Sequence, residues 1–221
     1  MRTLAGICVF AFLVTGTGSA ASKPHAVGFG KWSEVKVLVG DDESTPAEMK
    51  IRPLIVDGRV KEFTTGIAHD VTDRIFVVQR AYRLNDLLPQ ESGSSRWRWQ
   101  RGGWLLVDRT SGRVQAIALP AFDAYYSQVS WFRDYAAYCG LSDDASMRFS
   151  VVVQLGRRKP LLKKSVGEKS NAPANASCPP PVWARAPVRV TFDAPGEAKF
   201  AFIVRTQAVD LVTEEDDEGG N

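Results

Sequence analysis

The stretch Leu-Ile-Val-Asp-Gly-Arg-Val, residues 54–60, shows how this chain folds. Three apolar residues lead into Asp57-Gly58, and Arg59-Val60 begins a second extended run. An Asp-Gly pair between apolar runs predicts a two-residue β-hairpin turn, because that turn needs positive φ at both central positions. The stretch therefore predicts two antiparallel strands joined by a tight turn.

The same form recurs twice further along the chain. Leu105–Val107 leads through a turn into Gly112-Arg113, and Val151–Leu155 leads into Gly156-Arg157, with a return strand expected over 157–162. The glycines of the three hairpins stand 54 and 44 residues apart. Repeats of about 40–50 residues, with four strands in each, are typical of propeller blades.

A second kind of hairpin lies between these units. In residues 69–77 and 129–138 a strand meets a turn containing Asp and Arg, and a more apolar strand follows. Over about residues 50–164 this pattern resembles the inner hairpins of blades in TolB-like and WD-type propellers. The chain as a whole also resembles uncharacterised exported bacterial proteins. The resemblance implies propeller-like antiparallel blades and no particular activity.

The chain departs from that family in two respects. Phe132–Tyr135 stands where the family has a Ser-Pro-Asp-Gly turn, and the Trp-Asp dipeptide is absent. Two or three blades cannot stand alone, because each blade buries its faces only against its neighbours. Either a fourth unit from both termini closes the ring, or the fold is a β-sandwich.

The remaining pattern also favours strands. Ten to twelve short strands and no amphipathic helix are expected between Lys31 and Val204, which predicts an all-β fold. Arg74–Leu84 is interpreted as one strand, with a helical turn over Arg80–Leu88 as the alternative. Trp97–Gln100 and Trp104–Val107 are interpreted as two strands, separated by a break at the glycine pair between them.

One all-β domain is expected over residues 31–206. It includes a Pro-rich, linker-like loop at 165–181. Residues 207–221, which contain the acidic run Glu214–Glu218, are expected to form a disordered tail. Hydrophobic residues make up 44% of the chain and charged residues 24%, ordinary values for a domain with a sizeable core.

Residues 1–20 have the form of a signal peptide. Arg2 precedes an apolar run over Leu4–Val14, and small residues follow, so cleavage is expected after Ala20 or Ala21. The alternatives are an uncleaved anchor or a buried strand. The run is shorter than the roughly 20 residues of a membrane-spanning helix, and no longer run follows. A periplasmic or secreted protein with no transmembrane segment after cleavage is therefore expected.

Two cysteines, Cys139 and Cys178, remain once Cys8 leaves with the signal. In an oxidising compartment two cysteines suggest one disulfide. Two unpaired thiols are the alternative. The two histidines, His25 and His69, show no ligand spacing with these cysteines. No metal site and no cofactor are therefore predicted.

Basic and aromatic residues alternate in the most unusual stretch, Arg96-Trp97-Arg98-Trp99, and Trp104 follows nearby. On a strand, Trp97 and Trp99 face one side and the arginines the other. One hypothesis is a stacking platform for sugars or bases, or a contact with an anionic surface. The alternative is a pair of core tryptophans backed by solvated arginines.

Four other groups of residues are candidate sites. The basic residues Arg157-Arg158-Lys159, with Lys163 and Lys164, are candidates for binding an anion, and the alternative is a solvated edge strand. His69-Asp70 would supply a general base and an orienting carboxylate only if a nucleophile lies nearby. Carboxylate runs at 41–43 and 143–144 are interpreted as solvated turns, and Asn175-Ala176-Ser177 is a glycosylation acceptor in a host that glycosylates.

The sequence favours a non-enzymatic, exported binding or scaffold module of the cell envelope or periplasm. Its partner is expected to be an envelope protein or a glycan. No nucleic-acid partner is expected, because the formal net charge is +3 and the basic residues are not strongly clustered. The alternatives are a secreted hydrolase, acting for example on glycans through loop carboxylates, and a subunit that completes its sheet with another chain.

Overall fold

The computed structural model describes residues 25–38, 46–168, 178–193 and 199–205. These residues form fourteen β-strands and no helix, which confirms the all-β prediction. The strands are β1 (Val27–Phe29), β2 (Ser33–Leu38), β3 (Pro46–Val56), β4 (Arg59–Asp70), β5 (Ile75–Asn85), β6 (Trp97–Asp108), β7 (Val114–Ile117), β8 (Ser130–Phe132), β9 (Tyr135–Leu141), β10 (Met147–Gln154), β11 (Leu162–Glu168), β12 (Val182–Arg185), β13 (Val188–Phe192) and β14 (Phe200–Ile203). The stretches interpreted as a signal peptide and an acidic tail lie outside the described residues.

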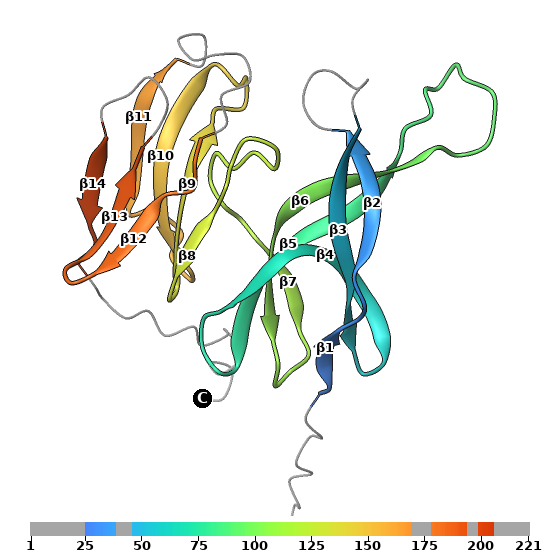
Figure 1. Cartoon of the computed structure of the whole chain (residues 1–221), viewed down its shortest axis with the longest axis horizontal. Coiled ribbons are helices and arrows are strands. Elements are labelled where there is room, and N and C mark those ends of the chain that lie inside the picture. The colour runs from blue at the N-terminus through green and yellow to red at the C-terminus, as the bar shows by residue number, and fades with distance from the viewer. Residues whose placement is uncertain (1–24, 39–45, 169–177, 194–198, 206–221) are drawn as a thin grey trace, which may run out of the picture.

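The strands from β2 to β6 close into a ring, shown at the right of Figure 1. Each strand pairs antiparallel with the next one, and β6 returns to β2 through a parallel pairing of Val37 with Trp99. Because five strands in a meander leave the first and last running in the same direction, the closing pair must be parallel. Closure leaves few free edges in this part of the molecule.

Apolar side chains of the ring strands fill its interior. One cluster contains Leu54, Phe76 and Leu105, and Phe29 of β1 packs against it. A second cluster contains Val37, Met49, Ile51 and Ala81, against which Phe63 and Trp99 pack. The interior is therefore a packed core built from alternate residues of neighbouring strands.

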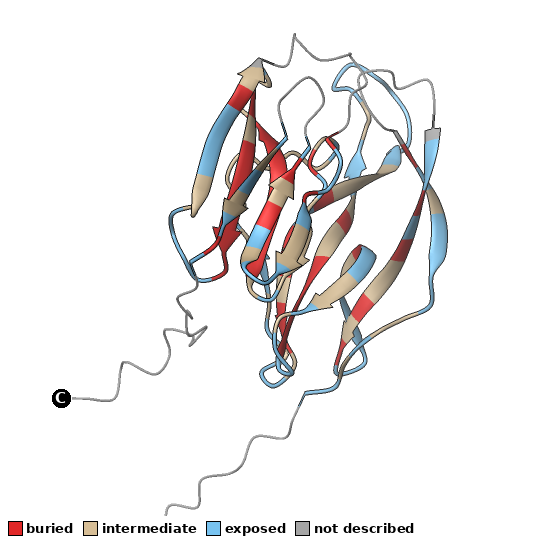
Figure 2. Cartoon of the chain, turned by 60° about the vertical axis from the view of Figure 1, so that its left-hand side comes forward, coloured by how far each residue is buried: buried red, intermediate tan, exposed pale blue. Residues whose placement is uncertain are grey.

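The second part of the molecule is a β-sandwich. Strands β8 to β11 form one antiparallel sheet and β12 to β14 form another. Tyr135, Ala137 and Val152 of the first sheet pack against Val190 and Phe192 of the second. The β-sandwich alternative therefore describes this part of the chain, and Figure 2 shows buried residues along its strands.

The disulfide between Cys139 and Cys178 lies in this sandwich core. The two Cα atoms are 6.1 Å apart, within the range that a disulfide spans, and both residues are fully buried. Cys139 lies on β9, and Cys178 begins the segment that leads into β12. The predicted cysteine pairing is confirmed, and it joins one sheet of the sandwich to the chain entering the other.

The outer face of the ring packs against the sandwich. Val77 of β5 and Trp104 of β6 form one cluster with Leu155, the residue after β10. The rings of Trp104 and Trp131 meet edge to face with centroids 5.3 Å apart. His69 Nε2 donates a hydrogen bond to the carbonyl oxygen of Arg133 at 2.8 Å. These contacts fix the two parts against each other.

The hairpins predicted from the sequence are present in the structure, but they do not form separate blades. Asp57 and Gly58 have φ angles of 52° and 75°, as the predicted turn requires. This hairpin joins β3 to β4 and the second joins β6 to β7, so both lie in one sheet; the third joins β10 to β11 in the sandwich. The propeller-like arrangement is not confirmed, because a hairpin pattern does not specify how hairpins are placed around one another.

Two strand boundaries differ from the predicted ones. The return strand after Gly156 is Leu162–Glu168 instead of 157–162, so it extends into the stretch interpreted as a linker. Strand β6 runs unbroken from Trp97 to Asp108, with a register shift against β5 instead of a break at the glycine pair. A Cβ at Gly102 would lie 3.0 Å from the Tyr82 ring, so the glycine allows this bulge.

Asp108 stabilises the turn between β6 and β7. Its buried carboxylate accepts hydrogen bonds from Arg74 Nε (2.9 Å) and from the backbone N–H groups of Thr110 (2.8 Å) and Ser111 (3.3 Å). The hydrogen bond from the Arg74 guanidinium is the main reason why the pKa of Asp108 lies well below its ordinary value of 3.8. The ionised carboxylate therefore stabilises the folded chain.

Replacing Asp108 with Asn is expected to lower the free energy of unfolding at pH 7 by about 2 kcal/mol. The depressed folded-state pKa means that the carboxylate contributes fully above its unfolded pKa, near 4, and that the contribution is lost as the pH falls below it. Urea unfolding at pH 7, 4 and 2 should therefore show the gap between wild type and variant closing below about pH 4. An unchanged gap at pH 2 would contradict this role, and Asp143→Asn, in an exposed turn, is the matched control.

Candidate functional site

The hairpin of β5 and β6 extends beyond the ring. The last residue of β5 paired with β4 is Ala81, whereas pairing between β5 and β6 continues to Asn85 and Trp97. Beyond the pairing of β6 with β2 at Trp99, the two strands continue as a two-stranded ribbon, and residues 86–96 connect them. In Figure 1 this connection projects away from the rest of the molecule. Both faces of the ribbon are thus accessible at its end.

The base of the ribbon is held in place from two sides. Inside the ring, the Trp99 ring packs edge to face on Phe63 with centroids 5.1 Å apart. On the other face, the Tyr125 hydroxyl donates a hydrogen bond to the Gln100 side chain, and burial raises the pKa of Tyr125. The projecting end therefore stands on a fixed base.

Large apolar side chains are exposed at the projecting end. Trp97 exposes 59% of its surface, and Leu88 and Leu84 expose 61% and 47%. Scattered exposed apolar residues are ordinary, but a short ribbon that exposes an indole on one face, Leu84 on the other and Leu88 in its connection is typical of a contact surface. We call the end formed by Arg83, Leu84, residues 86–96 and Trp97 the hairpin tip.

Arginines give the hairpin a positive charge. Residues 80–101 contain five Arg and two acidic residues, a net formal charge of +3. Arg98 is ion-paired with Asp86, and Arg80 Nε lies 2.9 Å from Glu62 of β4. Arg96 lies 3.8 Å from Glu91, beyond hydrogen-bond distance, and the Arg83 guanidinium lies 5.2 Å from the centre of the Trp99 ring. Arg83 and Arg96 therefore keep hydrogen-bond donors for a ligand.

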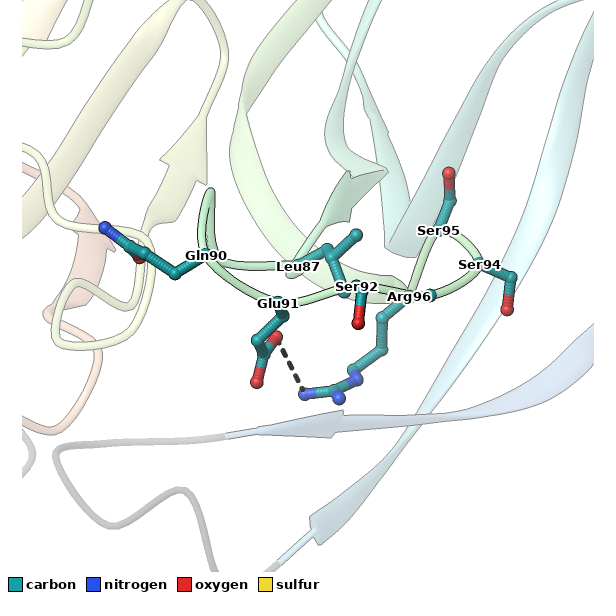
Figure 3. A pocket seen from close by; sticks show the side chains of 8 residues that line it. Leu87, Gln90, Glu91, Ser92, Ser94, Ser95 and Arg96 are labelled. Carbon is teal, nitrogen blue, oxygen red and sulfur yellow. Dashed lines mark ion pairs between the residues drawn. The ribbon is translucent and has the colours of Figure 1, made fainter.

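The connecting loop lines an open polar cup. Its volume is about 610 Å³, and Figure 3 shows Glu91 and Arg96 facing each other across it. The lining consists of hydroxyl, amide and charged side chains, backbone and one leucine: Leu87, Gln90, Glu91, Ser92, Gly93, Ser94, Ser95 and Arg96. Such groups donate and accept hydrogen bonds and suit a polar, hydroxyl-bearing ligand.

The structure places the residues of the Arg-Trp stretch in different environments. Arg96 and Trp97 lie on the hairpin tip, and Arg98 lies beside it in its ion pair with Asp86. Trp99 points into the ring, as the core interpretation expected. Trp104 is 8% exposed at the junction with the sandwich. Trp104 therefore lies outside the surface that its neighbours form, because the bulge and the sandwich bury its part of β6.

Several of the other candidate residues have structural partners, whereas Arg158 and Lys159 lie in an exposed turn. The His69 ring stacks on Trp131, and Asp70 Oδ1 accepts from Arg109 at 2.6 Å, so the two neighbours do not act on each other. Ser142 and Ser146 donate to Asp144, which lowers the pKa of that carboxyl to about 2. Lys163 and Lys164 lie over the rings of Phe149 and Phe200. Residues 41–43 and 175–177 lie outside the described residues.

The sequence did not reveal two parts of the hairpin tip. Arg83 faces the same side as Trp99, and only the register between β5 and β6 places it there. The polar cup is formed by a loop whose residues have no periodicity. The one available signal was the apolar pair Leu87-Leu88, of which Leu88 is exposed, inside an otherwise polar connection.

Comparison with known proteins identifies no relative. No family model matches the chain, and no curated protein and no solved structure matches it. Within the described ranges, no three or more His, Cys, Asp or Glu side chains lie together as metal ligands. The described part of the chain also contains no helical segment with the length and apolarity needed to cross a bilayer.

Proposed function

We propose that this protein is an exported, non-enzymatic binding module that contacts its partner through the hairpin tip. The observation that carries the proposal is the exposed indole of Trp97 on a ribbon whose base is fixed. Aromatic side chains with arginines beside them are the groups that contribute most at binding surfaces. A rigid base reduces the loss of conformational entropy when such a surface binds.

Two features support export. The sequence of residues 1–20 has the charged, apolar and small-residue segments of a signal peptide. The buried disulfide between Cys139 and Cys178 suits an oxidising compartment such as the periplasm or the extracellular space.

The carboxylates at the hairpin tip favour binding over catalysis. Asp86 is paired with Arg98, and Glu91 faces Arg96. Both carboxylates are therefore suited to orienting the arginines, which is a role in binding.

Replacing Trp97 with Ala is expected to weaken retention of the purified protein by an envelope fraction by about tenfold or more, because an anchoring aromatic is lost. The same change should alter the free energy of unfolding by less than about 0.5 kcal/mol, since the side chain is mostly exposed. Quantitative pull-down and urea unfolding measure the two effects.

The matched control is Trp32→Ala, at an indole with 45% exposure near β1. It should leave retention unchanged. Equal retention of the wild type and the Trp97 variant would remove the basis of the proposal. Trp99→Ala is not a substitute, because Trp99 packs on Phe63 and its loss should destabilise the ring.

A further inference from the structure

We infer that the ligand of the hairpin tip is an acidic polysaccharide, a glycan whose sugar rings carry carboxylates. This inference rests on the proposed function and names the chemical class of the partner. Three features of the tip carry it: an exposed indole, two neighbouring arginines (Arg83 and Arg96), and a cup lined by hydroxyl and amide groups.

The indole and one arginine lie on the same face of the ribbon. Trp97 pairs with Asn85, and Trp99 pairs with Arg83, so Trp97 and Arg83 are diagonal neighbours across the two strands. Diagonal neighbours are close enough for long side chains to meet one ligand. A sugar ring stacked on the Trp97 indole would therefore lie within reach of the Arg83 guanidinium.

The second arginine directs the ligand from the tip surface into the cup. Arg96 directly precedes Trp97 and lines the cup opposite Glu91. Ser92, Ser94 and Ser95 supply hydroxyl groups around it. Hydroxyl and amide side chains match the alternating donors and acceptors of a sugar ring, and a planar guanidinium matches a carboxylate in a two-pronged contact.

Charge distinguishes this ligand from a neutral glycan. Within the described chain Arg83 has no carboxylate partner, and the distance from Arg96 to Glu91 leaves both guanidinium groups able to bind an added anion. Hydrogen bonds between a guanidinium and a carboxylate are stronger than bonds between neutral groups. A polyanion should therefore bind more tightly than the same sugar backbone without carboxylates.

The experiment is isothermal titration of the purified protein with two matched probes, oligogalacturonate and oligogalactose. Oligogalacturonate is expected to bind at least about tenfold more tightly than oligogalactose, and raising NaCl to 1 M, where charges are strongly screened, should remove most of the difference. Arg83→Ser and Trp97→Ala should each weaken oligogalacturonate binding by about tenfold. Arg158→Ser, in the exposed basic turn after β10, should leave it unchanged.

Several results would overturn the inference. Equal affinity for the two probes would remove the role of the carboxylates, and a larger loss in the Arg158 variant would move the site to the basic turn. If oligogalacturonate does not bind while vesicles containing phosphatidylglycerol bind in a Trp97-dependent way, the partner is a lipid surface and the inference is wrong. If neither probe binds but an envelope fraction still retains the protein through Trp97, the inference fails and the proposed function stands.

Discussion

Removing the disulfide by the double change Cys139→Ala and Cys178→Ala is expected to lower the free energy of unfolding by about 4 kcal/mol. The two cysteines are 39 residues apart, and a cross-link across that separation removes a large part of the conformational freedom of the unfolded chain. Both side chains also lie in the sandwich core beside Val152 and Val190, so the loss of sulfur atoms adds a packing penalty.

Urea unfolding of the oxidised wild type, the reduced wild type and the double variant measures this effect. The reduced wild type should approach the stability of the double variant, because both lack the cross-link. Changing both cysteines together avoids leaving a single unpaired thiol in the core. A difference below about 1 kcal/mol between the oxidised wild type and the double variant would contradict the expected constraint.

Replacing Trp104 with Ala is expected to lower the free energy of unfolding by about 3–5 kcal/mol. The indole is buried between the ring and the sandwich, where it contacts Val77, Leu155 and Trp131. Removing it leaves a cavity that two separately folded parts cannot close without shifting against each other. The change should therefore loosen the junction as well as lower stability.

The same strand supplies the control for this prediction. Trp97 and Trp104 both lie on β6, one exposed at the ribbon end and one buried at the junction. The free energy of unfolding, measured in urea, should fall by several kcal/mol in Trp104→Ala and by less than about 0.5 kcal/mol in Trp97→Ala. Equal losses in the two variants would mean that the described junction does not hold in solution.

Local features of the fold could be predicted from the sequence. The turn at Asp57-Gly58 follows from its two residues, because few others adopt positive φ there at low cost. The disulfide followed from the count of cysteines together with the signal-peptide interpretation of residues 1–20. Alternation on β6 also correctly placed Trp97 and Trp99 on one face.

The arrangement of the hairpins could not be predicted in the same way. Which strand closes the ring depends on the pairing of β2 with β6, between residues about 60 positions apart, and no local pattern encodes that contact. Ile75–Val78 and Tyr135–Leu141 did carry a usable signal. Both are buried without interruption because they lie between two packed layers, and continuous apolar runs are typical of such strands.

The candidate site shows the same division between local and distant information. Alternation indicates that Trp97 and Trp99 share a face, but it does not indicate that β6 pairs with β2 at Trp99 or that Phe63 packs on that indole. These contacts place Trp99 in the core, whereas Trp97 lies beyond them and is exposed. The break predicted at Gly102-Gly103 was wrong for a related reason, since glycines inside a strand also permit a bulge.

The most direct test of the hairpin tip as the contact surface is chemical footprinting of the tryptophans, read by mass spectrometry, with and without the retained envelope material. Trp97 and Trp32 are both exposed in the free protein and should both be oxidised. In the bound protein Trp97 should be protected while Trp32 is oxidised as before. Undiminished oxidation of Trp97 in the bound protein, or protection of Trp32 in its place, would show that the partner binds elsewhere.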